Sequence, residues 1–351
     1  MTKVAIVGVS GYSGAELARL VLASQRNEAA PLELVAVYSD RARDQPLSSV
    51  DPRLGGFAAA AGITVLSQAD AASAGKLADI VALATPAEAS AELAPKLLDA
   101  GARVVDLSGA FRLEDKAEFR RYYGFEHPAP ALLEKARYGL VQVPGAAGSA
   151  PSASAAALIA NPGCYATAAI LSLAPLVAAG AIDETRVFID GKSGVSGAGR
   201  KLAENYLFME LGENVSPYRV ARHQHTPEIE LALSRVAGRP VRVTFVPHLL
   251  PIKRGLLTTS FAPMKSGFDA DAVSSAIARF YAGSPGLFGR PVVEASAPEQ
   301  VSIQSVHETE RARVGATLDA RTDSAVSICA IDNLLKGAAS QALENILAML
   351  G

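Results

Sequence analysis

The sequence predicts an α/β protein with two domains, a parallel-sheet domain followed by an α+β domain. Near the N-terminus, short β-branched runs alternate with helix-forming segments, which is typical of a parallel sheet with right-handed crossovers. A glycine-rich stretch joins the first such run to a helix. In the second half, many strand patterns are separated by long intervals, which favours a mixed or antiparallel sheet.

The composition narrows the class of protein. At 351 residues, half of them hydrophobic, the chain is long enough for two cores. A net charge of −2 without a dense Lys/Arg block argues against a nucleic-acid partner. Two cysteines are too few for a disulfide framework, and no apolar run has transmembrane length. Because the N-terminus runs directly into a strand pattern, we expect a cytoplasmic protein without a membrane partner.

The first strand, residues 3–7, leads into a glycine loop and a helix over residues 15–23. The spacing is G-x-x-G-x-x-G, one residue away from the common dinucleotide motif, and it serves the same physical need. The backbone must approach a pyrophosphate closely, and the helix N-terminus must face it. The alternative is a tight turn without a ligand. The candidate cofactor contacts here are Gly8, Ser10, Gly11, Tyr12, Ser13 and Gly14.

The second strand, residues 32–38, ends where a dinucleotide's ribose would lie. An acidic residue at this point favours NAD, and a basic residue favours the 2′-phosphate of NADP. Ser39 and Arg41 suit a phosphate, whereas Asp40 argues for NAD. We predict NADP; the alternative is that Arg41 and Arg43 are solvated loop charges.

Two further buried strands, residues 78–84 and 103–107, flank a helix over residues 87–100. Thr85 follows the first strand, and Ser108 follows the second. Since ligands gather at the carboxyl ends of parallel strands, Thr85 is a candidate cofactor contact and Ser108 a candidate substrate contact.

Arg112 lies just beyond Ser108, and its planar guanidinium suits a phosphate or a carboxylate. The alternative is a surface ion pair with Glu114 or Asp115. We expect residues 114–137 to be polar and helical, and residues 145–160 to form a loop or a weak strand.

Cys164 lies in the stretch Asn161–Tyr165, directly before a helix-forming run. A cysteine at a helix N-terminus has a lowered pKa, because unpaired N–H groups and the helix dipole stabilise the thiolate. From this stretch alone, a nucleophile and a small buried residue are equal alternatives. Cys329 lies in an apolar strand pattern and is predicted to be core.

A strand over residues 185–190 is followed by residues 191–200, which contain four glycines and two serines. Such a segment is a loop suited to close approach of a ligand, and the alternative is a flexible surface loop. The candidate cofactor contacts are Ser193, Gly194 and Gly197, and the candidate substrate contacts are Lys192 and Arg200.

His223 and His225 precede a helix that opens on Pro227. Two histidines could ligate a metal, but no third ligand has convincing spacing, so we predict no metal site. Proton transfer beside a thiol is the better function, with a polar helix cap as the alternative. Glu228 would orient a histidine or meet a cationic group of the substrate.

The remaining pattern predicts strands over residues 241–248, 255–261, 301–303, 314–320 and 327–331, and a helix over residues 270–282. A long final helix opens on an Asp332–Asn333 cap. Asn333 is a candidate partner for an amide such as nicotinamide. We expect this helix to return to the first domain.

In this order, the motifs resemble those of the N-acetyl-gamma-glutamyl-phosphate reductases, within the aspartate-semialdehyde dehydrogenase-like superfamily. The matching stretches span nearly the whole chain: residues 8–17, 106–113, 161–165, 193–200, 223–229, 247–257 and 333–342. One departure follows Leu140, where the family usually continues with Pro-Glu and this chain has Val141 and Gln142.

The resemblance implies a Rossmann NADP domain (1–160), a catalytic and dimerisation domain of the glyceraldehyde-phosphate dehydrogenase-like type (161–330), and a C-terminal helix (331–351). It implies reduction of N-acetyl-gamma-glutamyl phosphate by NADPH through a thioester at Cys164, in arginine biosynthesis. His225 is the preferred acid/base, Arg112 binds phosphate, and the chain forms a homodimer or homotetramer.

Other substrates and functions remain alternatives at this point. The acyl phosphate could be a carrier-linked aminoadipyl phosphate or aspartyl phosphate. Outside this enzyme class, the chain could be a catalytically silent NADP sensor or a thiol hydrolase.

Overall fold

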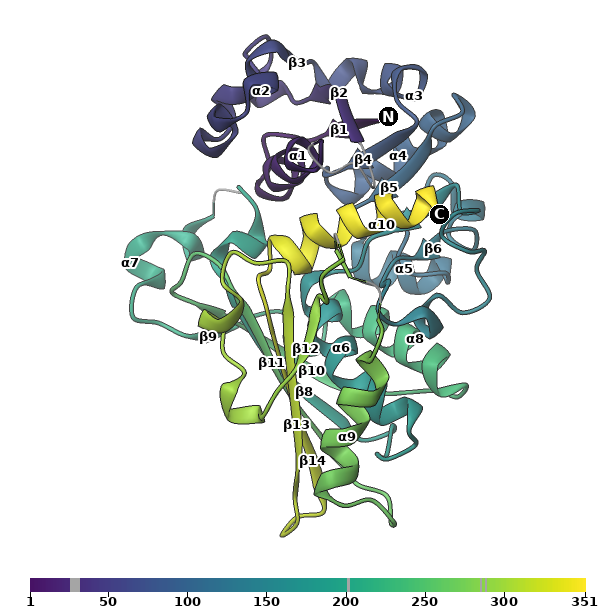
Figure 1. The fold of residues 1–351 in the computed structure, drawn as a ribbon, viewed down its shortest axis with the longest axis vertical. Coiled ribbons are helices and arrows are strands. Elements are labelled where there is room, and N and C mark those ends of the chain that lie inside the picture. The colour runs from purple at the N-terminus through teal and green to yellow at the C-terminus, as the bar shows by residue number, and fades with distance from the viewer. Residues whose placement is uncertain (26–31, 201–202, 285, 288) are drawn as a thin grey trace. The chain divides into compact units, whose positions relative to one another are not determined.

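The computed structural model describes residues 1–25, 32–200, 203–284, 286–287 and 289–351, and Figure 1 shows its fold. The chain divides into two compact units. The first comprises residues 1–139, 149–162 and 338–351, and the second comprises residues 140–148 and 163–337. Residues 140–148, which we expected in the first domain, therefore belong to the second unit, and residues 338–351 belong to the first.

The sheet of the first unit has the order β3-β2-β1-β4-β5-β7-β6. Each neighbouring pair is parallel, as predicted, and most strand residues are buried. The order reverses beside β1, where α/β sheets bind ligands at the carboxyl ends of the strands. The strands are β1 (Thr2–Val7), β2 (Leu32–Tyr38), β3 (Val65–Leu66), β4 (Ile80–Leu83), β5 (Arg103–Asp106), β6 (Arg137–Tyr138) and β7 (Leu158–Ala160).

The helix expected over residues 114–137 is much shorter in the structure. Only α5 (Lys116–Tyr123) forms, because Gly124 adopts a φ of +83° and prolines follow at positions 128 and 130. The other helices of the first unit are α1 (Tyr12–Ser24), α2 (Ala58–Gly62), α3 (Ala74–Leu77), α4 (Ala87–Asp99) and α10 (Ser340–Leu350).

The sheet of the second unit is mixed, as predicted, with the order β12-β13-β14-β11-β8-β10-β9. Strands β8 and β10 are parallel, whereas β11 is antiparallel to both β8 and β14. The strands are β8 (Val187–Gly194), β9 (Ser216–Pro217), β10 (Val243–Leu250), β11 (Leu256–Pro263), β12 (Val293–Ala295), β13 (Ala312–Asp319) and β14 (Ser324–Ile331).

Two of the strand predictions for this unit were wrong. Residues 191–194, assigned to a loop, continue β8 because β10 and β11 pair with them on both sides. Residues 301–303 form no strand; the short edge strand β12 pairs with β13 instead.

The helices of the second unit are α6 (Cys164–Ala178), α7 (Phe208–Leu211), α8 (His225–Ala237) and α9 (Ala270–Tyr281). Helix α6 is buried along nearly its whole length and packs on β11 and β14. On the other face of the sheet, alternate side chains face outward, and Phe188 and Phe261 are 52% and 41% exposed.

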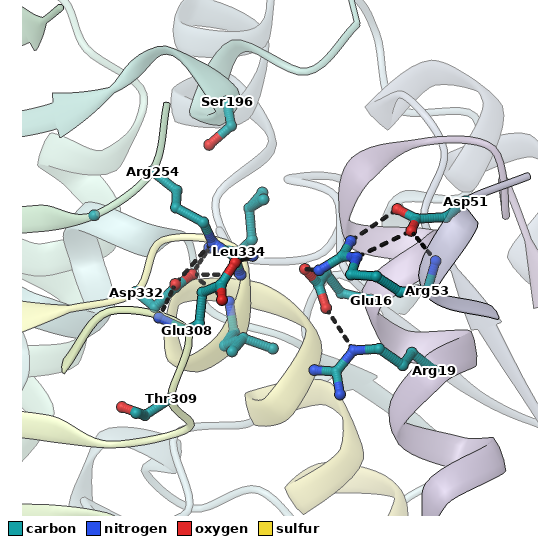
Figure 2. Close-up of polar contacts among 12 residues, drawn as sticks. Glu16, Arg19, Asp51, Arg53, Ser196, Arg254, Glu308, Thr309, Asp332 and Leu334 are labelled. Atoms are coloured by element: carbon teal, nitrogen blue, oxygen red, sulfur yellow. Dashed lines mark hydrogen bonds and ion pairs between the residues drawn. The ribbon is translucent and has the colours of Figure 1, made fainter. Parts of the chain in front are cut away.

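The chain leaves β14 through a capped turn. The Asp332 carboxylate accepts hydrogen bonds from the backbone N–H groups of Leu334 (2.9 Å) and Leu335 (3.1 Å), as the predicted cap requires. It also pairs with the buried Arg254 guanidinium, with Nε 2.8 Å from Oδ2 (Figure 2). A π-helical turn, Leu335–Ala339, follows before α10. Such turns are rare and are frequent at functional sites.

Candidate active site

Cys164 is the first residue of α6, as predicted, and its side chain is half-buried. Gly163 caps this helix with an extended backbone. The thiol therefore lies at the N-terminus of a long helix, where the helix dipole favours the thiolate. Cys329, by contrast, is fully buried in β14, and burial raises the pKa of its thiol.

Helix α8 supplies the polar groups next to this turn. The Gly163 N–H donates to Glu228 Oε1 at 2.8 Å, and Glu228 is buried. Glu228 Oε2 lies 3.9 Å from Nε2 of His225. The imidazole of His225 lies directly against Gly163, since a Cβ on that glycine would be only 2.2 Å from Nε2. Glu228 and His225 thus both contact the residue that precedes the thiol.

The two histidines have different surroundings. His223 is enclosed by the rings of Tyr165, Tyr218 and Phe245, with centroids 5.3–5.9 Å from its own. Burial lowers the pKa of His223 to about 2, so its ring is neutral at physiological pH. Its Nδ1 accepts the backbone N–H of His225 at 3.1 Å. His223 therefore fixes the start of α8 and packs on Tyr165, whereas His225 lies against Gly163, the residue before the thiol.

The π-helical turn borders the thiol from another side. A Cβ on Gly337 would be 2.8 Å from Cβ of Cys164, so only glycine fits there without movement. Asn333 is the residue expected to bind an amide of the cofactor, but both polar atoms of its side chain form hydrogen bonds within the second unit. Its Oδ1 accepts the Gly255 N–H at 2.7 Å, and its Nδ2 donates to Ser196 Oγ at 3.0 Å.

The glycine stretch after Ile189 is a packed element. A Cβ on Gly194 would lie 2.8 Å from backbone atoms of residues 252 and 254. Ser193 is buried, and its Oγ donates to the Gly194 carbonyl at 3.0 Å. Gly197 lies in the short helical turn that follows, where a Cβ would be 3.4 Å from Ser193 Oγ. Ser193 and Gly194 are thus the last residues of β8, and the turn that follows contacts Asn333 through Ser196.

The side chain of Lys192 does not lie on the sheet face that packs against the helix of Cys164. Along β8, Gly191 packs against Tyr165 of α6, so the alternation directs Lys192 to the opposite face of the sheet. There Lys192 Nζ forms an ion pair with Asp190. Arg200 is exposed and directly precedes residues that lie outside the described part of the chain.

In the first unit, the loop between β1 and α1 has the form of a dinucleotide cradle. Gly8 has a φ of +88°, and a Cβ there would be 2.4 Å from the Ala84 carbonyl oxygen. A Cβ on Gly14 would be 2.3 Å from the Gly8 carbonyl oxygen. Gly11 caps α1, which begins at Tyr12 and continues through Ser13. The glycines let the backbone reach the helix N-terminus closely, as a bound pyrophosphate requires, so the residues present fit this group.

After β2, the acidic residue that would favour NAD and the residues that would favour NADP have different surroundings. Ser39 is buried, and its Oγ lies 2.5 Å from Oγ of Ser10 in the glycine loop. Asp40 Oδ1 accepts the Gln68 N–H at 2.9 Å and the Ser67 hydroxyl at 3.2 Å. Arg41 is exposed to solvent. The Asp40 carboxylate is therefore hydrogen-bonded to the turn before α3, whereas the Arg41 side chain lies at the surface.

Arg112 lies between the carboxyl ends of two neighbouring strands. Its Nε donates to the Asn161 carbonyl and its Nη2 to the Leu107 carbonyl, both at 2.8 Å. Ser108 Oγ donates to the buried Asp106 carboxylate at 2.8 Å. Burial raises the pKa of Asp106. On the neighbouring strand end, Thr85 Oγ1 lies 2.8 Å from Ser90 Oγ.

Comparison with known proteins places these features in a family. The sequence model "Semialdehyde dehydrogenase, NAD binding domain" matches residues 3–149, and "Semialdehyde dehydrogenase, dimerisation domain" matches residues 164–333. The chain belongs to the semialdehyde dehydrogenase family. Relatives named N-acetyl-gamma-glutamyl-phosphate reductase include those of Heliobacterium modesticaldum, 40% identical, covering 100% of this chain and 96% of the relative, and Brevibacillus brevis, 37% identical, covering 99% and 95%.

Solved semialdehyde dehydrogenase structures share the fold. Aspartate semialdehyde dehydrogenase II from Vibrio cholerae superposes with a TM-score of 0.72 at 17% identity, covering 100% of this chain and 98% of that one. The enzyme with NADP from Candida albicans gives 0.64 at 13% identity, with the same coverage. The predicted fold class and resemblance are thereby confirmed, as is a nicotinamide-dependent oxidoreductase domain.

Within the described residues, no group of three or more His, Cys, Asp or Glu side chains is arranged to hold a metal ion. The same part of the chain contains no helix long and apolar enough to cross a membrane.

Several closely packed residues were not among the candidates that the sequence suggested. Gly337, which packs against Cys164, lies in a helix-forming run. Asn161 and Asn345, whose buried side chains hydrogen-bond to each other within the first unit, were not candidates either. Buried polar side chains within apolar helices, such as Asn345, were the available signal.

Proposed function

We propose that this chain reduces N-acetyl-gamma-glutamyl phosphate to N-acetylglutamate 5-semialdehyde with NADPH, releasing phosphate, as a step of arginine biosynthesis. The observation that carries the proposal is a cysteine at a helix N-terminus with His225 against the preceding glycine. This arrangement occurs in a chain whose full-length relatives bear the name of that reductase.

The thiolate of Cys164 attacks the acyl carbon, so that an S–C bond forms and the C–O bond to phosphate breaks. The helix N-terminus stabilises the thiolate before attack. A dinucleotide held by the glycine loop between β1 and α1 would supply the hydride that reduces the resulting thioester. Cys164 then leaves with the S–C bonding electrons, which releases the aldehyde.

His225 is the proposed acid/base for the thiol proton of Cys164. Its imidazole takes the thiol proton when Cys164 becomes a thiolate, and it returns that proton to the sulfur after the aldehyde has left. General acid/base assistance of this kind contributes about 10²–10⁴-fold. Glu228 orients His225 and holds the Gly163 N–H, which is a positioning role.

Arg112 and Ser108 are our candidates for the departing phosphate. Two carbonyls hold the guanidinium of Arg112 in one orientation, so it would bind phosphate with little further loss of side-chain entropy. Arg200 remains a candidate substrate contact. For Lys192 the geometry supports no such role, since its side chain is on the sheet face opposite α6.

We infer a preference for NADP from the end of β2. With Asp40 bound to Gln68 and Ser67, Ser39 and Arg41 are the groups that would receive a 2′-phosphate. Replacing Arg41 with alanine should raise KM for NADPH roughly tenfold, the value of one charge-assisted hydrogen bond, and leave KM for NADH unchanged. Arg43→Ala is the control, because Arg43 pairs with Asp44. An equal effect of Arg41→Ala on both cofactors contradicts the assignment.

We also propose that two copies of the chain pair through the face of the second-unit sheet that carries Phe188 and Phe261. Large exposed apolar side chains on one sheet face mark an interface, and the matching domain is described as a dimerisation domain. Light scattering should show a dimer or tetramer that Phe188→Asp dissociates. An unchanged mass in that variant contradicts this interface.

The reverse reaction tests the reaction itself. With phosphate, NADP and N-acetylglutamate 5-semialdehyde, the protein should produce NADPH, and aspartate semialdehyde should be a much poorer substrate. Faster turnover of aspartate semialdehyde would favour aspartyl phosphate instead. If NADP binds but no acyl-phosphate pair turns over, the sensor alternative holds.

A further inference from the structure

Lys336 is a fully buried lysine to which the mechanism above gives no role. Its Nζ donates a hydrogen bond to Oε1 of Gln142 at 2.7 Å, and Gln142 is buried as well. Both residues belong to the second unit. An ammonium group and an amide are costly to bury unless their hydrogen bonds are made, so this contact constrains the two segments that carry them.

Lys336 directly precedes the glycine that packs against the thiol residue. A Cβ on Gly337 would lie 2.8 Å from Cβ and 3.3 Å from Cα of Cys164, so the backbone there closes one side of the start of α6. The Gly337 N–H donates to the Asp332 carbonyl at 3.0 Å, and the Asp332 carboxylate pairs with Arg254 (Figure 2). This turn is therefore held at its start by Asp332 and next to Gly337 by Lys336.

Gln142 belongs to a short segment of the second unit, residues 140–148, that packs on α8. Arg235 of α8 donates from Nη1 to the Ala146 carbonyl at 2.9 Å, and Ala146 is fully buried. Helix α8 begins at His225, the proposed acid/base. Through Gln142, the segment therefore connects the helix of the acid/base to the turn beside the thiol.

We propose that Lys336 is a positioning residue for Cys164. Its hydrogen bond to Gln142 fixes the turn after β14, and the backbone of Gly337 in that turn then limits where the Cys164 side chain can lie. This inference rests on the role of Cys164 as the nucleophile proposed above. The role requires no contact between Lys336 and the reacting atoms.

Four variants test this role. Lys336→Met removes the donor in a side chain of similar length, and Gln142→Met does the same for the acceptor, whereas Gln142→Glu keeps an oxygen at that place. If a single change prevents folding, the double variant Lys336→Met/Gln142→Met replaces both partners with apolar groups, which can be nearly neutral for stability.

Lys265→Met is the matched control. It also removes a lysine hydrogen bond within the second unit, since Lys265 Nζ donates to Glu184 Oε2 at 2.8 Å. Melting temperatures identify variants of comparable stability.

The readouts are kcat, KM for NADPH, and the pH dependence of Cys164 alkylation by iodoacetamide. A displacement near 1 Å lowers rates by about 10²-fold, so we expect a kcat loss approaching this size in Lys336→Met, Gln142→Met and the double variant, with KM for NADPH unchanged. The alkylation profile should shift to higher pH, because a thiol that is free to leave the helix N-terminus loses thiolate stabilisation. Gln142→Glu and Lys265→Met should retain the wild-type kcat and profile.

The proposal is overturned if the folded Lys336→Met, Gln142→Met or double variant keeps the wild-type kcat and alkylation profile. It is equally overturned if Gln142→Glu loses as much activity as Gln142→Met, since the acceptor oxygen would then not matter. The same holds if Lys265→Met, at the same melting temperature, loses as much, because the effect would be one of general stability.

Failure of the proposed function is a distinct result. The wild-type protein would then not turn over the acyl phosphate, while the alkylation comparison would still report on the position of the Cys164 thiol.

Discussion

Replacing Gly163 with alanine tests whether the His225 imidazole belongs to the site. The backbone at Gly163 is extended, with a φ of −72° and a ψ of 151°, so alanine can adopt it without strain. The added Cβ would lie 2.2 Å from Nε2, 2.6 Å from Cε1 and 2.7 Å from Cδ2 of His225. The substitution therefore acts first on the histidine ring, which must move away from the added methyl group.

The size of the effect follows from these distances. Ordinary van der Waals contact begins near 3.4 Å, and 3.4 − 2.2 gives a required movement of about 1.2 Å. A misplacement of about 1 Å in a catalytic group costs about 10²-fold in rate, or about 2.7 kcal/mol. We expect kcat to fall by this factor while KM for NADPH, whose proposed binding site is the glycine loop of the first unit, stays constant.

Steady-state kinetics of Gly163→Ala give both constants, and thermal melting shows whether the fold is retained. Gly62→Ala is the control, because nothing lies within 4 Å of a Cβ at that position and its φ is not positive. Wild-type kcat in a folded Gly163→Ala protein would refute the reasoning that His225, held against this glycine, serves the cysteine.

Three further predictions concern buried polar groups. His223→Gln should leave the acid limb of the pH–rate profile in place, because the pKa of His223 is already lowered to about 2 by burial and its ring does not titrate in the working range. Arg254→Met should destabilise the protein by about 3–5 kcal/mol in urea unfolding, since it leaves the buried Asp332 carboxylate without its cation. Lys265→Met should lower the free energy of unfolding at pH 7 and change it little at pH 2. Burial raises the pKa of Glu184, but hydrogen bonds from Lys265 and Arg239 outweigh burial and lower this pKa from 4.5 to about 2.

The sign of the last prediction follows from linkage. A carboxylate whose folded-state pKa is depressed contributes stability that is present above pH 4.5 and lost as the pH falls towards 2. A pH-independent effect of Lys265→Met would contradict it. A shifted acid limb in His223→Gln, or an Arg254→Met variant as stable as wild type, would contradict the other two.

Local chemistry made some features of this protein predictable from sequence. The helix start at Cys164 follows from a Pro-Gly turn before a helix-forming run, and both were visible in a few residues. The glycine loop between β1 and α1 was also predictable. Gly14 packs against Gly8 within the loop itself, and Gly8 packs against the end of the adjoining strand.

Other features depend on partners distant in sequence. Residues 191–194 have the composition of a loop, but pairing with β10 and β11 makes them a strand, since tertiary context overrides the weak propensity of glycine and serine. Val301 to Ile303 has strand propensity but lies beside no strand that pairs with it. Asn345 contacts Asn161 across 184 positions, and no local pattern indicates such a contact.

The central claim is that the acyl group passes through a thioester on Cys164. Incubating the protein with N-acetyl-gamma-glutamyl phosphate without NADPH, followed by mass spectrometry of the cysteine peptides, tests it most directly. We predict one N-acetylglutamyl group on Cys164, with one phosphate released per chain, and an unmodified Cys329. An enzyme that turns over with NADPH but never carries acyl mass on Cys164, or a Cys164→Ser variant with full activity, would contradict the account.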